Sequence, residues 1–322
     1  MNIDSYFEHI SEDIEAFENY FKEAVKSRVP LLDRIMRYIV NRKGKQLRPK
    51  FVLLCARLGG NINDSTLRAA SLVELLHTAT LVHDDVVDDS LERRGFFSVN
   101  ALWKNKVAVL VGDYLLSKGL LLSLGNNDFE VLKILSEAVK MMSEGELLQI
   151  EKARNLNVKE DIYYEIIKGK TASLLSSACG AGACTTFNDP EKIEKLKLFG
   201  ENTGMAFQIK DDLFDYGTEN IGKPTGNDIK EKKLTLPLIY TLNNCDAGMK
   251  RKITNIIKNE STDKVKVKFI TDTVKQVGGI DYATEKMIGF RNNALSLLYE
   301  FPESDSRTAL EQLVRFTTDR TY

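Results

Sequence analysis

The sequence has little glycine, proline or cysteine, and each shortage argues against a class of protein. Its 20 glycines and 6 prolines make up about 8% of the 322 residues, where roughly 12% is usual, so it lacks the turn residues that a many-stranded β protein needs. The 4 cysteines form no CxxC pair and have no zinc-type spacing, which indicates reduced thiols in a core. Neither a disulfide framework nor a zinc site is therefore expected.

An excess of charge of one sign is also missing. Lys and Arg number 45 against 46 Asp and Glu, so no global basic field exists and nucleic acid is not expected as a partner. The acidic, amphipathic N-terminus does not have the form of a secretory signal. The longest uncharged stretch, residues 171–188, is rich in Ser, Thr, Ala and Gly rather than steadily apolar. We therefore expect no transmembrane segment and a cytoplasmic location.

What the chain does have is helical periodicity. Apolar residues recur at intervals of three and four, as in Leu32, Ile35, Met36 and Ile39. Breaks at Gly, Pro and Asn positions divide this pattern into about ten or more helices. No Pro/Ser-rich linker or block of charge marks a domain boundary, so we predict a single all-α domain over residues 1–322.

The segment Asp84-Asp85-Val86-Val87-Asp88-Asp89 places four carboxylates at the end of an apolar helical pattern. On a helix Asp84 and Asp85 would share a face with Asp88, where like charges repel each other and burial increases the cost. A divalent cation relieves this repulsion most simply, and hard oxygen ligands suit magnesium shared with a phosphate. Taken alone, the segment also fits a solvated acidic helix end or another calcium or magnesium site.

The segment Asp211-Asp212-Leu213-Phe214-Asp215 repeats the Asp-Asp-x-x-Asp spacing after another apolar helical run. Two such faces could oppose each other across a helical bundle and hold several magnesium ions between them. The spacing lacks the Gly and the final Glu of an EF-hand loop, and the chain has no Glu-x-x-His pairs of a di-iron site. The repeat therefore favours a magnesium site.

Basic residues stand close to both acidic segments in the sequence. Arg offers a forked donor to phosphate oxygens and Lys a point charge, so a diphosphate could be held between cations and metal ions. For each basic residue alone, a solvated surface charge is the simpler interpretation. The residues are Lys45, Arg48, Arg93, Arg94, Lys170, Lys223, Lys232 and Lys233.

The joint order of these motifs resembles the trans-isoprenyl diphosphate synthases, the polyprenyl synthetase family, from about Gly44 to Tyr282. The matching motifs are Gly44-Lys45-x-x-Arg48-Pro49, the run from Glu74 to Asp88, Arg93-Arg94-Gly95, Gly112-Asp113-Tyr114-Leu115, Glu144-Gly145-Glu146 with Gln149, Lys170-Thr171-Ala172, Gly204-Met205-Ala206-Phe207-Gln208, Asp211-Asp212-x-x-Asp215, Gly222-Lys223-x-x-Gly226-x-Asp228 and Lys233-Leu234-Thr235-Leu236-Pro237. So many specific motifs in one order are not expected by chance.

The resemblance implies an isoprenoid synthase bundle around a deep central cavity. There isopentenyl diphosphate would be condensed head to tail with an allylic diphosphate, such as a farnesyl or geranylgeranyl primer, giving a longer all-trans polyprenyl diphosphate and free diphosphate. The resemblance also implies a homodimer, magnesium as cofactor, with three ions around a bound diphosphate, and the released diphosphate as a candidate base for the last proton.

The same resemblance implies roles for individual residues. The metal ligands would be Asp84, Asp85, Asp88, Asp211, Asp212 and Asp215, with Asp212 supporting the second site. The allylic diphosphate would contact Arg93, Lys170, Lys223 and Lys233, and isopentenyl diphosphate would contact Lys45, Arg48, His77 and Arg94. Thr171 and Gln208 would line the reacting centre, and the catalytic set would be Lys170, Thr171, Gln208, Asp84 and Asp211.

Product length should depend on the residues just upstream of the first acidic segment. Ala79 and Thr80 lie five and four residues before Asp84, about 6 to 7.5 Å along a helix, and both are small. Relatives that make farnesyl or geranylgeranyl chains often have a bulky aromatic there, so its absence favours a medium or long product. Ala79 could instead simply pack against another helix. The stop could then come from Tyr114, Leu121 or Phe129.

Three positions depart from the family pattern. Lys43 stands where a Gly often precedes Gly44, Phe97 where a Pro is usual, and Lys232 where a Gly usually precedes Lys233. The last adds positive charge to the loop expected over the allylic diphosphate, where it could tighten product release or simply face water.

Three alternative functions are weighed against this one. A short-chain synthase making geranylgeranyl or farnesyl diphosphate would share all the motifs. A class I terpene cyclase would usually carry an Asn/Ser/Glu triad in place of Asp211-Asp212-x-x-Asp215. A non-catalytic synthase subunit should have lost acids or basic residues, but both sets are complete here.

Overall fold

Helices begin and end where the sequence supplies capping residues. The computed structural model describes residues 4–41, 44, 46–93, 95–155, 159–217 and 226–319, without the side chains of Arg93, Arg154 and Asn155. The helix α4 (Asp64–Val87) begins with a capping box between Asn63 and Thr66, and α9 (Pro190–Phe214) begins with an Asp189 cap followed by proline. Gly278, at a φ of 86°, separates α13 (Lys264–Val277) from α14 (Gly279–Leu298). A polar cap, a proline or a glycine thus marks each of these helix ends.

The first half of the chain forms the body of a helical bundle. Its elements are η1 (Asp4–Ile10), α1 (Ser11–Ala24), α2 (Pro30–Val40), α3 (Leu47–Gly59), α4, β1 (Glu92–Arg93), β2 (Phe96–Phe97), α5 (Val99–Leu124) and α6 (Phe129–Asn155). In this body α4 packs along α5, and α3 packs on the later helix α8. The all-α fold predicted from the sequence is confirmed.

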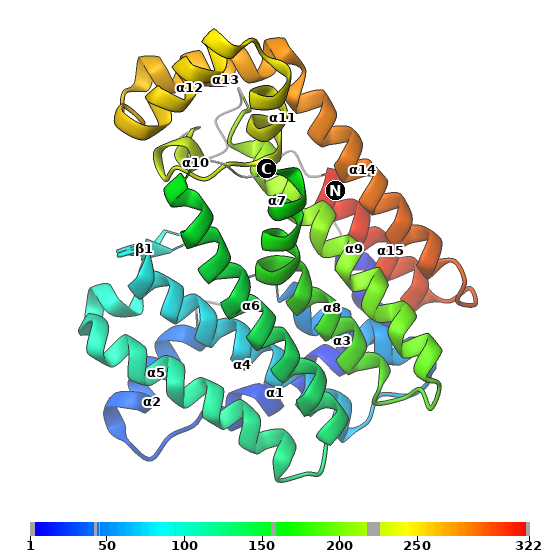
Figure 1. The fold of residues 1–322 in the computed structure, drawn as a ribbon. Helices are drawn as coiled ribbons and strands as arrows, with labels where there is room; N and C mark the ends of the chain where they lie inside the picture. Colours follow the sequence, from blue (N-terminus) through cyan, green and yellow to red (C-terminus); the bar gives the residue numbers. More distant parts are fainter. Residues whose placement is uncertain are drawn as a thin grey trace.

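The second half adds two long helices and a group of short ones. Its elements are α7 (Glu160–Ile167), η2 (Lys168–Ala172), α8 (Ser173–Ala183), α9, α10 (Asn227–Lys230), α11 (Leu236–Asn244), α12 (Ala247–Asn259), α13, α14 and α15 (Asp305–Asp319). Figure 1 shows α10 to α13 gathered at the top of the view, while α14 descends from there beside α9.

The apolar interior consists of two clusters joined by the long helices. One cluster fills the body of the bundle and includes Phe199 of α9 and Leu298 of α14. The other lies among α7, η2 and α10 to α14 and includes Ile209 of α9 and Met287 of α14. Because α9 and α14 contribute residues to both clusters, these two helices connect the two parts of the apolar interior. The single domain predicted from the sequence stays a prediction.

A short antiparallel ribbon interrupts the helices after the first acidic segment. In β1 and β2 Glu92 pairs with Phe97 and Arg93 with Phe96, and Gly95 at the turn has a φ of 77°. Two residues in each strand are too few to give an alternating pattern, so the sequence did not predict this ribbon.

Helix α5 has one face in the bundle and one outside it. Among the described helices, it is the one that is long and apolar enough to cross a membrane by length and composition. Of its most apolar 18-residue stretch, 33% is buried. The sequence analysis turned to residues 171–188 rather than to this helix, because Asp113 and Lys118 interrupt the uncharged runs of α5. Its inner face lies close to α4, since a Cβ on Gly112 or Gly119 would overlap His83 or Leu72.

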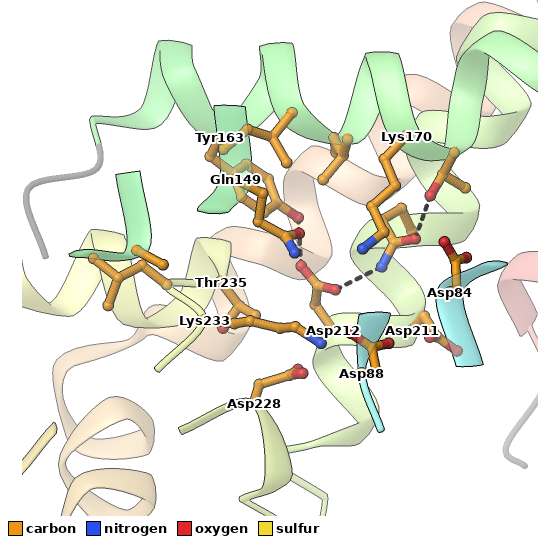
Figure 2. A pocket seen from close by; sticks show the side chains of 16 residues that line it. Asp84, Asp88, Gln149, Tyr163, Lys170, Asp211, Asp212, Asp228, Lys233 and Thr235 are labelled. Carbon is orange, nitrogen blue, oxygen red and sulfur yellow. Dashed lines mark hydrogen bonds between the residues drawn. The ribbon is translucent and has the colours of Figure 1, made fainter. Parts of the chain in front are cut away.

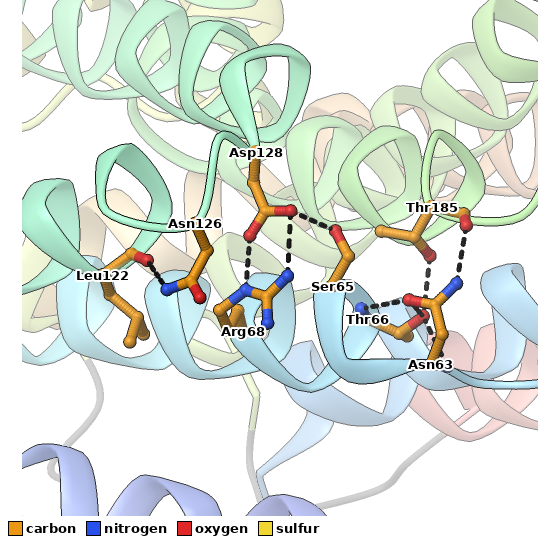
Figure 3. A network of polar contacts seen from close by, with 8 residues as sticks. All are labelled: Asn63, Ser65, Thr66, Arg68, Leu122, Asn126, Asp128 and Thr185. Atoms are coloured by element: carbon orange, nitrogen blue, oxygen red, sulfur yellow. Dashed lines mark hydrogen bonds and ion pairs between the residues drawn. The ribbon is translucent and has the colours of Figure 1, made fainter.

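A polar network ties the starts of α4 and α6 together, at the end of α4 away from its acidic residues (Figure 3). Asp128, just before α6, accepts hydrogen bonds from Ser65 Oγ at 2.7 Å and from Arg68 Nη2 at 3.1 Å. The Arg68 and Asp128 side chains are only 13% and 9% exposed. Burial alone would raise the pKa of Asp128, but the hydrogen bonds from Arg68 and Ser65 and the charge of Arg68 outweigh it, and the pKa lies below its ordinary value. The pair therefore links α4 to α6.

We expect Asp128→Asn to lower the free energy of unfolding by about 2 kcal/mol at pH 7, because Arg68 keeps its burial and loses its counter-ion. The control Glu144→Gln, in the exposed Lys140 pair, should change it by less than about 0.5 kcal/mol. Urea denaturation measures both. A lowered carboxylate pKa contributes stability at pH values above the unfolded-state pKa, and this contribution is lost as the pH falls through the folded-state pKa. The difference in stability between wild type and Asp128→Asn should therefore shrink below about pH 4. Equal midpoints for wild type and Asp128→Asn at pH 7 would show the pair to be dispensable.

Candidate active site

The acidic ends of α4 and α9 meet at one cavity. Asp84 and Asp88 line it from α4, and Asp211 and Asp212 line it from α9, in a volume of about 350 Å³ (Figure 2). Asp84 and Asp88 share a face because they are four residues apart on a helix. The structure therefore brings together carboxylates from the two segments that the sequence singled out.

Asp212 belongs to a hydrogen-bond chain in the wall of this cavity. Its Oδ2 accepts from Tyr163 Oη at 2.7 Å and its Oδ1 accepts from Gln208 Nε2 at 2.9 Å. Thr171 Oγ1 donates to Gln208 Oε1 at 2.7 Å. Burial, with the charge of Asp228, raises the pKa of Asp212 to about 8. This position suits the supporting role predicted for Asp212, whereas a metal ion bound to it would share an oxygen with one of these donors.

Asp215, the third acid of the second segment, is not among the residues that line this cavity and instead caps α10. Its two carboxylate oxygens accept from the backbone N–H groups of Asn227 at 2.8 Å and Asp228 at 3.1 Å. Burial nevertheless raises its pKa above the ordinary value. This capping brings Asp228 to the cavity, where burial and the charge of Asp215 raise the pKa of Asp228 to about 7. Sequence reasoning gave Asp228 no role, although its motif was visible.

A second cavity, of about 710 Å³, contains the predicted isopentenyl diphosphate residues that the structure describes. Arg48 Nη1 lies 3.0 Å from His77 Nε2, and both line this cavity. Asp85 also lines it rather than the first cavity, because one residue along a helix turns the side chain by about 100° from Asp84. Lys45 and Arg94, predicted for the same site, lie outside the described residues.

Lys170 and Thr171 project from a π-helical turn, η2, which is a frequent feature of functional sites. The turn lies against α6 at Gly145, where a Cβ would sit 2.9 Å from the backbone nitrogen of Lys170. Lys170 Nζ contacts Glu146 Oε2 at 2.5 Å. Glu146 is thus a partner that sequence reasoning quoted without assigning, and Gly145 allows the close approach.

Lys233 is the second described cation of the first cavity. Burial lowers its pKa, but a hydrogen bond to Glu231 and the charges of nearby acids, including Asp228, outweigh burial, so the pKa is raised and Lys233 stays charged. Lys232 has a φ of 59°, a conformation that glycine adopts without strain, and its Nζ donates to Lys258 O at 2.9 Å. The extra charge of Lys232 is therefore directed to another part of the surface. Arg93 has its backbone in β1, and Lys223 lies outside the described residues.

The two residues predicted to set product length lie on α4, between Thr78 and Leu81, which line the second cavity. Ala79 is fully buried in the core of the bundle, and Thr80 Oγ1 donates to His77 O at 2.8 Å. Among the described residues, neither contributes to the lining of the two cavities above. The burial of Ala79 fits the packing interpretation as well as a role in product length.

The carboxylates of the first cavity are suited to magnesium shared with a ligand. In the described part of the chain, no three His, Cys, Asp or Glu side chains come close enough to hold an ion by themselves. The carboxylates on opposite walls offer oxygen donors only, and burial together with neighbouring acids raises the pKa of Asp212 and Asp228. Magnesium prefers such oxygen donors and would complete its coordination with water and phosphate oxygens. The residues present therefore fit the predicted cofactor.

The sequence model of the family described as Polyprenyl synthetase matches residues 29–274. The chain belongs to this family. It is 36% identical, over 97% of its length and 96% of the relative, to an all-trans-nonaprenyl-diphosphate synthase (geranyl-diphosphate specific) of Rhodobacter capsulatus. It is 31% identical to the octaprenyl diphosphate synthase of Escherichia coli K12, with 99% of each chain covered. The family resemblance given by the motifs is confirmed.

Solved structures agree with the sequence relatives. A polyprenyl synthase from Caulobacter crescentus CB15, crystallised with calcium and isoprenyl diphosphate, superposes with a TM-score of 0.91 at 33% identity, covering 100% of this chain and 98% of that one. The isoprenoid synthase fold and the activity class, a prenyltransferase of the trans-polyprenyl diphosphate synthase type, are therefore established. The roles of individual residues stay predictions.

Proposed function

We propose that this polyprenyl synthetase uses magnesium to condense isopentenyl diphosphate with an allylic diphosphate, giving a long all-trans polyprenyl diphosphate. The observation that carries the proposal is the pairing of the α4 and α9 carboxylates across one cavity. Beside it lies the second cavity with Arg48 and His77. One diphosphate would bind in each.

The first step is cleavage of the allylic carbon–oxygen bond, which leaves a carbocation and a diphosphate that gains negative charge. Magnesium, when bound, supplies positive charge to this leaving group. Lys170 and Lys233 add fixed positive charge at the wall of the cavity, where Glu146 and Glu231 hold their ammonium groups. The co-crystallisation of the Caulobacter relative with calcium and isoprenyl diphosphate supports a divalent ion here.

The second step joins the carbocation to isopentenyl diphosphate, which Arg48 and His77 would hold by its phosphates. Thr171 and Gln208 would place oxygen atoms beside the positive carbon. A fixed second substrate and the exclusion of water are both required, because water would quench the cation. We propose the released diphosphate as the base that removes the last proton.

The product would be long, since the relatives compared above are named nonaprenyl and octaprenyl synthases. The small side chains of Ala79 and Thr80 support this length, and a farnesyl or geranylgeranyl diphosphate would serve as primer. A short-chain synthase stays the alternative, because the buried position of Ala79 also fits simple packing. A cytoplasmic location stays a prediction.

The two acids that face each other across the first cavity should be essential to turnover. We expect Asp84→Asn and Asp211→Asn each to reduce turnover roughly 1,000-fold or more, because each removes a charged ligand from the metal-diphosphate group. Asp89→Asn, in the same acidic segment but outside the lining, should keep activity within about threefold. The assay supplies isopentenyl diphosphate, each allylic primer and magnesium, with mass analysis of the products. Full turnover by either essential variant would refute the assigned roles.

Product length should respond to a bulky side chain at Ala79 or Thr80, the two predicted product-length residues. We expect Ala79→Phe to shorten the chains, because an aromatic ring on α4 would block their path, while Val87→Phe on the exposed side of the same helix should leave them unchanged. Chromatography of the dephosphorylated chains measures both. Circular dichroism verifies that Ala79→Phe remains folded, and Thr80→Phe repeats the test at the less buried neighbour. Products of unchanged length from folded variants at both positions would show that Ala79 and Thr80 do not set product length.

We also propose that the chain forms a homodimer through the outer face of α5. Leu110 and Leu121 on this face are 67% and 64% exposed, and Leu147 of α6 is also exposed. Large exposed apolar faces mark association surfaces. A second copy would bury this face and account for the apolar length of α5.

The double variant Leu110→Glu/Leu121→Glu should therefore be a monomer by light scattering where the wild type is a dimer, because burying two carboxylates at an apolar interface is costly. Val265→Glu, at an exposed apolar residue of α13, serves as the control and should stay dimeric. A monomeric wild type, or a double variant that stays dimeric, would contradict the proposal.

A further inference from the structure

Tyr163 is a buried phenol beside the reacting centre to which none of the roles above is assigned. It lies on α7, immediately before the turn that carries Lys170 and Thr171, and its side chain is 3% exposed. Its hydroxyl oxygen is 2.7 Å from Asp212 Oδ2, and it lines the first cavity. Its ring also makes an edge-on contact with Tyr164, at 5.5 Å between centroids.

The hydrogen bonds that begin at Tyr163 have a defined direction (Figure 2). The Tyr163 O–H is directed at one oxygen of Asp212 and the Gln208 N–H at the other, so each donor has its own acceptor atom. The carbonyl end of the Gln208 amide is thereby turned toward Thr171, whose hydroxyl donates to it. A reversed amide would set two N–H donors of Gln208 against the Thr171 hydroxyl instead.

This direction matters for the charge that the cavity presents. Gln208 and Thr171 both line the cavity, and in the observed order their oxygen atoms retain lone pairs that can face a carbocation. If Asp212 rotated, the Gln208 amide could turn and present its positive N–H end to the same carbon. Tyr163 holds one of the two Asp212 oxygens in place.

We propose that Tyr163 is a positioning residue that acts through Asp212 to fix the orientation of the Gln208 amide and the Thr171 hydroxyl at the reacting carbon. This inference rests on the proposed function, because it requires a cation to form beside these two oxygens. Fixed dipoles stabilise a developing charge more than dipoles that must first reorient.

The first test is the rate of a single condensation with enzyme in excess, which separates the chemical step from product release. We expect Tyr163→Phe to lower this rate about tenfold or more, because Asp212 loses a buried hydrogen-bond donor, with KM for both substrates within about twofold. Tyr164→Phe is the matched control, since its hydroxyl donates to Glu160 at 3.0 Å, outside this chain of bonds. It should keep the rate within about twofold of wild type.

The second test is rescue at the same position. Replacing Tyr163 by 4-aminophenylalanine retains a ring and an N–H donor to Asp212, so it should restore the single-condensation rate to within about threefold of wild type. A purely structural phenol predicts that melting temperature and rate fall together. A positioning role predicts a slow but fully folded Tyr163→Phe enzyme.

The third test is a double-mutant cycle. Asp212→Asn breaks the relay, because one end of the new amide must now donate where the carboxylate accepted. Adding Tyr163→Phe should then lower the rate by less than about twofold, whereas independent roles would multiply the two losses.

The outcomes separate this inference from the proposed function. A wild type that makes no product with any primer overturns the proposed function and the inference with it. An active wild type whose Tyr163→Phe variant is as fast as Tyr164→Phe overturns the inference alone. So does a loss that 4-aminophenylalanine does not rescue, or a cycle in which the losses multiply. If Tyr163→Phe does not fold, the 4-aminophenylalanine variant decides the question: a rate within about threefold of wild type supports the inference, and a slower but folded enzyme overturns it.

Discussion

Repulsion between carboxylates that two helices bring to one small cavity is the constraint on which the rest of this site depends. Asp84 and Asp88 meet Asp211, with Asp212 and Asp228 beside them, and burial raises the pKa of the last two. Such a group is costly without positive charge. Lys170 and Lys233 supply part of that charge. We propose that a diphosphate carrying magnesium would supply the rest, so that substrate binding would relieve the repulsion that the fold creates.

The fold holds these charges where they are by fixing both ends of the helices that carry them. At the far end of α4, Arg68 and Asp128 tie it to the start of α6. At the near end, Gly145 lets α6 approach the π-helical turn that presents Lys170 and Thr171. Asp215 caps α10 with both of its carboxylate oxygens, and this contact brings Asp228 to the cavity. Packing along the bundle and charge placement at its end are thus parts of one arrangement.

Much of this could be predicted from the sequence, and the exceptions have physical reasons. Helical periodicity and the breaks at Gly, Pro and Asn positions predicted the all-α fold, and motif order predicted the family. Spacing alone could not assign each acid, because Asp85 differs from Asp84 by one helical step and lines the other cavity. The capping by Asp215 depends on where a distant turn folds back. The link from Tyr163 to Asp212 joins residues far apart in the chain, and no local pattern encodes it.

The most direct test of the central claim is anomalous diffraction from crystals grown with manganese and an unreactive, sulfur-substituted allylic diphosphate. The account predicts manganese peaks between Asp84 and Asp88 on α4 and Asp211 on α9, bridged by the diphosphate, with Lys170 and Lys233 on its oxygens. A diphosphate bound elsewhere, or metal ions held by one helix alone, would contradict it.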